Sequence, residues 1–228
     1  MIEIKDISVS FDEKKVLSNI NLSLQKGLIH GLVGLNGAGK TTLLNVLYGF
    51  IKPKNGEIIF ENRRLKRNQV AFLEATNFFY SNITGKEYLQ IFPHQNKSFD
   101  LNSWQDLFHL PLDELVENYS TGMKKKLALL GILQLDKPIL ILDEPFNGLD
   151  LETSKILEIL VRELKNKGKT IIITSHILET LTNSCNFIHF LVNGQIQRTY
   201  PSIEFTQLND HLFKDFEQRI TEVIKNTV

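Results

Sequence analysis

The sequence predicts an α/β fold with a parallel sheet at its core, and two observations support that prediction. Three nearly continuous apolar runs, 28–33, 139–142 and 170–174, have the pattern of strands that are buried on both faces. Segments with a helical spacing of apolar residues, 41–47 and about 151–165, follow the first two runs. Strands that alternate with helices form crossover units, so these strands should pair in parallel.

The chain ahead of the first helix predicts a small antiparallel β subdomain at the N-terminus. Residues 2–10 and 19–25 alternate apolar and polar side chains, which indicates two half-buried antiparallel strands. Asn55-Gly56 is a turn signal, and the β-rich segment Glu57–Phe60 follows it directly.

The C-terminal part predicts two more strands and a helix. Residues 186–192 and 195–200 flank the turn Asn193-Gly194, which is typical of a hairpin. From about Ser202 onward the spacing predicts a final amphipathic helix.

A single domain is expected to span residues 1–228, because a chain of this length can bury one sizeable core. Between about 76 and 136 the strand signals fade, and Leu, Phe, Asp and Lys at helical intervals predict a mostly helical insertion. The core should then comprise about 1–75 and 137–228.

The composition is that of a globular protein without a charge preference. Hydrophobic residues make up 42% of the chain and charged residues 23%, and 26 basic side chains balance 26 acidic ones. This balance does not indicate nucleic acid as a partner. The densest basic cluster, Arg63, Arg64, Lys66 and Arg67, is expected to be a solvated loop.

Cysteine content and the apolar runs predict a cytoplasmic location. Cys185 is the only cysteine, which excludes an intrachain disulfide and fits a reducing compartment. The N-terminus carries acidic residues where a secretory signal would be apolar. No apolar run approaches the roughly 20 residues of a membrane helix, so work at a membrane would need a partner that spans it.

The strongest functional signal is a P-loop (Walker A) pattern, G-x-x-x-x-G-K-T, between a buried strand and a helix. Its glycines let successive N–H groups point toward phosphate oxygens, and the helix start adds its positive dipole end. The lysine neutralises the outer phosphates, and the threonine hydroxyl suits Mg²⁺. The expected nucleotide contacts are Gly34, Asn36, Gly37, Ala38, Gly39, Lys40, Thr41 and Thr42.

Two acidic residues follow the buried strand 139–142. Asp143 is the candidate carboxylate for Mg²⁺, which a P-loop needs at the end of a neighbouring strand. Glu144 comes next, and adjacent residues at a strand end point to opposite sides. We therefore expect Glu144 to be the general base, or to orient the attacking water. The alternative is two solvated acids at a strand end.

With these motifs in place, the sequence resembles the nucleotide-binding domains of ATP-binding-cassette (ABC) transporters over essentially the whole chain. The family signature, usually Leu-Ser-Gly-Gly-Gln, is matched by Tyr119–Met123, in which Ser120 and Gly122 are kept and three positions depart. Ser120 is a good helix N-cap, and a helix start offers free N–H groups to a phosphate. The resemblance implies that this phosphate belongs to ATP held by the opposite subunit.

Two further segments have counterparts in that family. Pro145–Asp150 looks like the D-loop, which crosses the dimer interface, so the resemblance places Asp150 beside the nucleotide. Thr174-Ser175-His176 ends the following strand, where the family has a switch histidine that contacts the γ-phosphate. A lone histidine is usually structural, but the position of His176 at this strand end favours catalysis. The catalytic set implied is Lys40, Glu144 and His176.

Two family features are less clear in this sequence. Phe11 follows the first strand where the family has an adenine-stacking aromatic residue, although a core phenylalanine is an alternative. The family's Q-loop glutamine should fall near Glu74 or Ala75, and no glutamine stands there. Glu74 is therefore the candidate third ligand for Mg²⁺, directly or through water.

The resemblance implies an ATPase that binds ATP and Mg²⁺ between two subunits, in a homodimer or a heterodimer, on the cytoplasmic face of an integral membrane permease. The variant Tyr-Ser-x-Gly-Met is similar to that of cassettes paired with export permeases. The alternative is a soluble, non-transport ABC ATPase of DNA repair or translation. Residues 76–136 have neither the length nor the heptads of the repair proteins' coiled coils, and only one cassette is present.

The resemblance also implies a groove that receives a short permease helix, bounded by Phe72–Thr84 and by helices near 85–115. This region is rich in aromatic residues, and we expect about half of them to be core and the rest to line the groove. The six are Phe78, Phe79, Tyr80, Phe92, Trp104 and Phe108.

Overall fold

A computed structural model describes residues 1–208, and its largest sheet has six strands. Five of them pair in parallel, including the three that the sequence predicts, and the edge strand β10 is antiparallel to β9. In spatial order the strands are β10 (Gln195–Pro201), β9 (Phe187–Val192), β3 (Ile29–Val33), β8 (Thr170–Thr174), β7 (Ile139–Leu142) and β6 (Val70–Leu73).

The register of the three central strands fixes where the functional loops leave the sheet. Leu32 of β3 pairs with Thr174 of β8, and Leu142 of β7 pairs with Ile173. These strands therefore end side by side, because the carboxyl ends of parallel strands meet at one edge. Ligands of open α/β sheets bind outside that edge.

The second sheet is antiparallel and has the order β2 (Lys14–Leu24), β1 (Ile2–Phe11), β4 (Asn55–Phe60) and β5 (Arg63–Arg64). Two predicted boundaries were wrong. β2 begins at Lys14 instead of residue 19. Asn55-Gly56 belongs to β4, where Gly56 has a φ of 86° and a Cβ would lie 2.2 Å from the carbonyl oxygen of Lys5.

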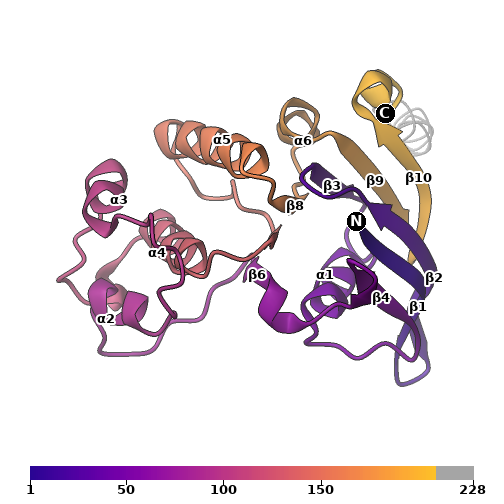
Figure 1. Ribbon diagram of the computed structural model, residues 1–228, viewed down its shortest axis with the longest axis horizontal. Helices are drawn as coiled ribbons and strands as arrows, with labels where there is room; N and C mark the ends of the chain where they lie inside the picture. The colour runs from indigo at the N-terminus through magenta and orange to yellow at the C-terminus, as the bar shows by residue number, and fades with distance from the viewer. Residues whose placement is uncertain (209–228) are drawn as a thin grey trace, which may run out of the picture.

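The helices are divided between the sheets and an insertion at one end of the molecule (Figure 1). The helices α1 (Lys40–Tyr48), α5 (Leu151–Asn166) and α6 (Leu178–Ser184) accompany the core sheet. The insertion holds α2 (Gly85–Gln90), α3 (Leu101–Phe108) and α4 (Thr121–Gln134), at the left of Figure 1. Short 3₁₀ turns complete the list: Arg67–Gln69, Val116–Asn118 and Ser202–Glu204.

Two apolar clusters hold these layers together. One lies between the sheets and contains the buried face of α1, from Leu43 to Leu47, with Leu32 and Ile172 of the core sheet. The other covers the opposite face, where Leu127 and Leu130 of α4 join strand residues such as Leu140. The insertion is thus anchored on the core sheet through α4.

Three details complete the fold. β6 and α6 were not predicted from the sequence. The predicted C-terminal helix is seen only at its start, with residues 205–208 helical, and its remainder lies outside the described residues. Within residues 1–208, no helix combines the length and the apolar character needed to cross a bilayer.

Candidate nucleotide site

The P-loop connects β3 to α1 in a conformation that requires glycine at three positions. Gly37 and Gly39 have φ angles of 81° and 107°, in the left-handed region that other residues avoid. A Cβ on Gly34 would lie 2.3 Å from the carbonyl oxygen of Leu191. A Cβ on Gly37 would meet nothing within 4 Å, so this part of the loop faces open space, as an anion cradle must.

Lys40 is the first residue of α1, and its side chain folds back across the loop. Its Nζ donates hydrogen bonds to the carbonyl oxygens of Gly34 at 2.7 Å and Leu35 at 3.4 Å. The ammonium group is therefore held above the cradle that the loop forms. A phosphate entering the cradle would meet this cation and the exposed start of the helix together.

Asp143 and Glu144 follow β7, and Thr174 at the end of β8 contacts both of them. The Thr174 hydroxyl donates to Asp143 Oδ1 at 2.5 Å and accepts from the backbone N–H of Glu144 at 2.9 Å. Glu144 has a φ of 48°, so its backbone is in the left-handed region. The strand alternation that the sequence argument assumed therefore does not apply to Glu144, because its backbone is not extended.

Glu144 is buried, yet one of its carboxylate oxygens has no hydrogen bond among the described residues. Oε2 accepts from the backbone N–H of His176 at 3.2 Å. Oε1 lies 2.7 Å from Nδ1 of the same histidine, but outside hydrogen-bond geometry. Buried polar atoms normally have partners, so this oxygen is suited to accept from a water molecule in the pocket.

The surroundings of Glu144 also change its acidity. Burial raises the pKa of the Glu144 carboxyl above its ordinary value, and the neighbouring Asp143 carboxylate adds to this rise. His176, through its charge and its backbone N–H, and Lys40 act in the opposite direction. A raised pKa brings a carboxylate closer to the range in which it accepts a proton from water.

A pocket of about 630 Å³ joins these groups. It includes the expected P-loop residues Asn36, Gly37, Gly39, Lys40, Thr41 and Thr42 together with Asp143, Glu144 and His176. Three more segments complete the lining: Lys14 to Val16, Ala75, and the turn Asn193-Gly194. The sequence analysis named Ala75 as a possible Q-loop position and the turn as part of a hairpin, but it did not expect Lys14 to Val16 or the turn at the site. The buried Ala38 and the half-buried Gly34 support the loop from beneath without lining the pocket.

The structure does not bring Phe11 and Glu74 into this lining. Phe11 is 49% exposed at the end of β1, where it pairs with Lys14, so it lies next to the pocket wall. Glu74 is exposed, and its charge acts on Tyr88 in α2. Within residues 1–208, no group of three or more His, Cys, Asp or Glu side chains is arranged to hold a metal.

The signature segment begins α4 in the insertion and does not line the pocket either. Ser120 is the N-cap of α4, and its hydroxyl accepts from the backbone N–H of Met123 at 3.2 Å. Asp150 caps α5 and accepts from the N–H of Thr153 at 2.7 Å, which lowers the pKa of its carboxyl. Gly122 faces the D-loop, since a Cβ there would lie 3.1 Å from the carbonyl oxygen of Gly148.

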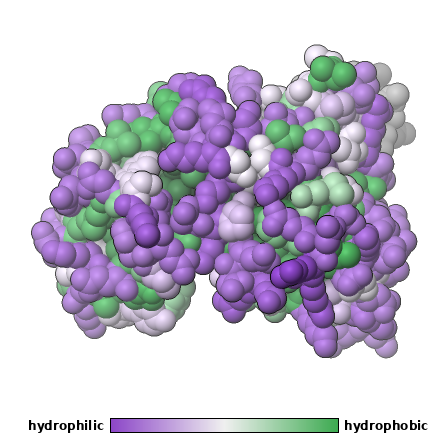
Figure 2. All heavy atoms as spheres, in the orientation of Figure 1, coloured by the Kyte–Doolittle hydropathy of each residue, from purple (hydrophilic) through white to green (hydrophobic). Residues whose placement is uncertain are grey.

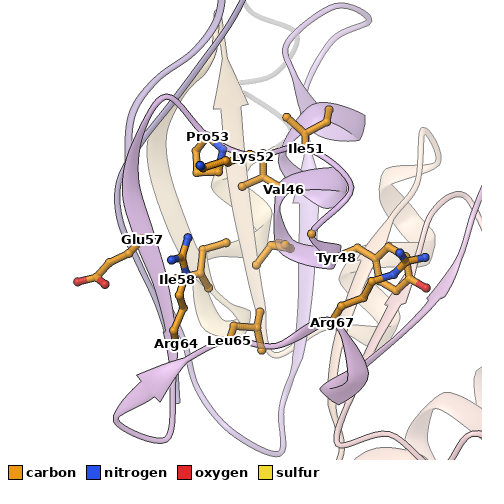
Figure 3. A pocket seen from close by; sticks show the side chains of 12 residues that line it. Val46, Tyr48, Ile51, Lys52, Pro53, Glu57, Ile58, Arg64, Leu65 and Arg67 are labelled. Carbon is orange, nitrogen blue, oxygen red and sulfur yellow. The ribbon is translucent and has the colours of Figure 1, made fainter.

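A second hollow, of about 170 Å³, lies between the end of α1 and the β4–β5 hairpin and shares no lining residue with the nucleotide pocket (Figure 3). The Arg67 guanidinium lies 4.7 Å from the ring centroids of both Tyr48 and Phe50 beside it. The basic cluster predicted as a solvated loop is exposed. Two of its members, Arg63 and Arg64, form the short strand β5.

A P-loop after the buried strand β3, with a carboxylate at the end of β7, defines a nucleotide-hydrolysing P-loop protein. β8 lies between these two strands, so they are not direct neighbours as the sequence analysis expected. The chain matches the ABC transporter family over residues 17–147. It is 32% identical over 205 residues to the ABC transporter ATP-binding protein YtrB of Bacillus subtilis (strain 168), which covers 86% of this chain and 70% of the relative. The lantibiotic transport ATP-binding protein SrtF of Streptococcus pyogenes is 30% identical over 203 residues, 86% of this chain and 89% of the relative.

Solved structures agree with the sequence comparison. An ATP binding subunit of an ABC transporter superimposes with a TM-score of 0.79 at 28% identity, over 95% of this chain and 93% of that one. The chain therefore belongs to the ABC transporter family, as an ATP-binding subunit with ATPase activity.

Proposed function

We propose that the chain binds MgATP at an interface between two cassettes and that hydrolysis there drives a separate membrane permease, an exporter. The observation that carries this proposal is the division of the site. Lys40, Asp143, Glu144 and His176 line one pocket, whereas Ser120 belongs to the insertion and does not reach it.

Within the pocket, each residue has a distinct role. The P-loop N–H groups and Lys40 hold the β- and γ-phosphates, and His176 stands at the γ-phosphate end beside Glu144. Glu144 holds the attacking water through Oε1 and takes its proton, and burial prepares it for this by raising the pKa of its carboxyl. His176 places Glu144 through its backbone N–H.

The residues present also suit Mg²⁺. Thr41 and Asp143 both line the pocket and offer the oxygen ligands that this ion prefers. Asp143 is oriented by its bond from Thr174. The ion would neutralise charge on the phosphates. Glu74 is not needed for this role, because Mg²⁺ usually keeps several waters and takes one or two protein ligands.

A second cassette would complete the site. Exposed apolar side chains stand immediately after three site residues: Leu35 is 60% exposed, Ile177 is 54% exposed and Leu151 is 92% exposed. Large apolar groups around a polar site are typical of an interface that is covered during function. In such a sandwich, the start of α4 from the partner would present Ser120 and its free N–H groups to the γ-phosphate.

The permease would dock on the insertion. Of the six aromatic residues predicted for this region, Phe108 is buried, and Phe79, Phe92 and Trp104 are half-buried and pack on the apolar cluster. Phe78 and Tyr80 are 75% and 57% exposed and form an edge-to-face pair 5.2 Å apart. Figure 2 shows apolar groups over the insertion, at the left of the view, between hydrophilic residues. An exposed aromatic pair of this kind suits an amphipathic helix.

The direction of transport rests on the signature variant and on a relative. SrtF is described as a lantibiotic transport ATP-binding protein. The cassette would then sit at the cytoplasmic face of the membrane through its permease, with ATP, a second cassette and the permease as partners.

The substitution Glu144→Gln tests the sandwich. It keeps the shape of the side chain and removes the base, so ATP should bind and the closed dimer should accumulate. Size-exclusion chromatography with MgATP is expected to show a dimer for this variant and a monomer without nucleotide. Glu179→Gln, an exposed glutamate on α6, serves as a control. A Glu144→Gln protein that binds ATP and stays monomeric would contradict the proposal.

A further inference from the structure

A buried lysine in the first turns of α4 reaches across to the catalytic segment. Lys125 is 6% exposed, and its Nζ donates to the backbone carbonyl oxygens of Glu144 at 2.6 Å and Asn147 at 3.0 Å. Lysine is seldom buried unless its ammonium is satisfied, because removing the charge from water is costly. Its buried position is therefore explained by these two hydrogen bonds and not by apolar packing.

One of the two carbonyls that accept from Lys125 belongs to Glu144, whose backbone conformation is rare for a non-glycine residue. Glu144 is in the left-handed region, which a non-glycine residue keeps only when its surroundings enforce it. The N–H of Glu144 is fixed by the Thr174 hydroxyl, and its carboxylate is fixed by the N–H of His176. Lys125 supplies the remaining restraint, on the carbonyl.

We propose that Lys125 is a positioning residue for ATP hydrolysis, which holds the peptide of Glu144 in the orientation that aims its carboxylate at the water. This inference rests on the role proposed for Glu144. Lys125 does not line the pocket, so it acts through Glu144 and does not touch the nucleotide.

The same lysine joins the signature helix to the D-loop. Gly122 and Gly148 are in close contact, and the Lys126 ammonium lies 3.9 Å from the Asp150 carboxylate. With the bonds from Lys125, these contacts make the start of α4 and the segment 144–150 one unit.

The charge of Lys125 fits this place. Burial lowers the pKa of Lys125, and the carboxylates of Glu144 and Asp143 raise it in return. An ammonium group has three N–H bonds at the end of a long side chain, so it can serve both carbonyls at once. The position thus favours lysine over a shorter polar residue.

The test compares Lys125→Met with Lys124→Met, which removes the partly exposed neighbouring lysine from the same helix. Small misplacements of catalytic groups are costly, so Lys125→Met should lower kcat for ATP hydrolysis at least about tenfold and leave KM within about twofold. Lys124→Met should match the wild type. Lys125→Arg, which keeps donors near both carbonyls, should recover part of kcat. If Lys125→Met does not fold, as judged by thermal denaturation, Lys125→Gln takes its place.

A double-mutant cycle separates positioning from general support of the fold. If Lys125 acts through Glu144, then Lys125→Met should not slow the residual hydrolysis of Glu144→Gln any further. An unchanged kcat in Lys125→Met, or additive losses in the double variant, would overturn the inference. Wild-type turnover in Glu144→Gln itself would instead refute the proposed role of Glu144, so the two failures are distinguishable.

Discussion

In the proposed two-cassette sandwich, the core sheet and the helical insertion carry different halves of one catalytic site. The core half is assembled in a single chain, because β3, β7 and β8 end side by side and bring Lys40, Asp143, Glu144 and His176 around one pocket. The insertion half carries Ser120 outside that pocket. Under the proposed function, the groups of the core half are built on the sheet, and a second chain delivers the group that completes the site.

The two halves are nevertheless packed together. Leu127 and Leu130 of α4 belong to the same apolar cluster as Leu140 of β7 and Ile171 of β8. The signature segment is therefore connected to the core sheet through the packing of α4. The helix α4 is thus the element that packs the insertion on the core.

The largest expected effect tests this division directly. Lys40→Ala removes the P-loop cation and Ser120→Arg fills the signature site, so each variant alone should lose ATPase activity by at least about 100-fold. Mixing the two variants should restore activity, because a mixed dimer contains one site with an intact Lys40 and an intact Ser120. In a 1:1 mixture about half of the dimers are mixed, so about a quarter of wild-type turnover is expected.

A coupled ATPase assay on the separate and mixed proteins measures this restoration. Lys124→Met mixed with Lys40→Ala provides the matched control, in which only Lys40→Ala is inactive. No gain on mixing Lys40→Ala with Ser120→Arg would argue against a site that is shared between two chains. Full activity of Lys40→Ala alone would remove the P-loop assignment.

The core half could be predicted from the sequence because its signals are local. The P-loop spacing, the acids after 139–142 and the Thr174–His176 segment each follow a short apolar run, and parallel topology brings such strand ends together. No distance between these segments had to be known. The same argument predicted the alternation of strands and helices along the chain, apart from β6 and α6.

What the sequence did not reveal depends on contacts between distant segments. β6 is only four residues long, and α6 only seven, so neither shows a clear period. Lys125 stands in a lysine-rich stretch that looks solvated, and only tertiary packing shows that it is buried. The lining residues Lys14 and Lys15 were also missed, because two adjacent basic residues do not show the alternation that would mark the start of β2.

A smaller effect is expected at the exposed aromatic pair of the insertion. Phe78→Asp with Tyr80→Asp should release the chain from membranes that contain its permease, because the charges oppose docking of an apolar helix face. ATP affinity and basal hydrolysis should stay unchanged, because neither residue lines the nucleotide pocket. Membrane flotation after co-expression measures the release, with Ile203→Asp, a distant and 87% exposed position, as the control. Loss of ATP binding in the double variant would contradict a docking role.

The smallest effect concerns a buried histidine pair in the core half. His30 of β3 and His189 of β9 are 1% and 2% exposed, and Nδ1 of His30 lies 3.1 Å from Nε2 of His189. The backbone carbonyl of Gln25 and the hydroxyl of Thr199 contact the outer nitrogens. Burial lowers the pKa of both rings, to about 3 for His189, where His30 contributes as well. Both are therefore neutral in the folded protein at neutral pH.

The unfolded chain binds protons at these histidines more tightly than the folded chain, because the model-peptide pKa is about 6.5. Their contribution to stability is therefore complete above that pH and is lost as the pH falls below it. For His189 the free energy of unfolding should decrease by about 1 kcal/mol between pH 6.5 and 5.5. Urea denaturation followed by circular dichroism measures this slope, which His189→Gln should flatten and exposed His94→Gln, in the insertion, should leave unchanged. If His189→Gln leaves the pH dependence of the free energy of unfolding unchanged, the acid sensitivity does not arise from this buried histidine pair. The core and the insertion would then not differ in their response to pH.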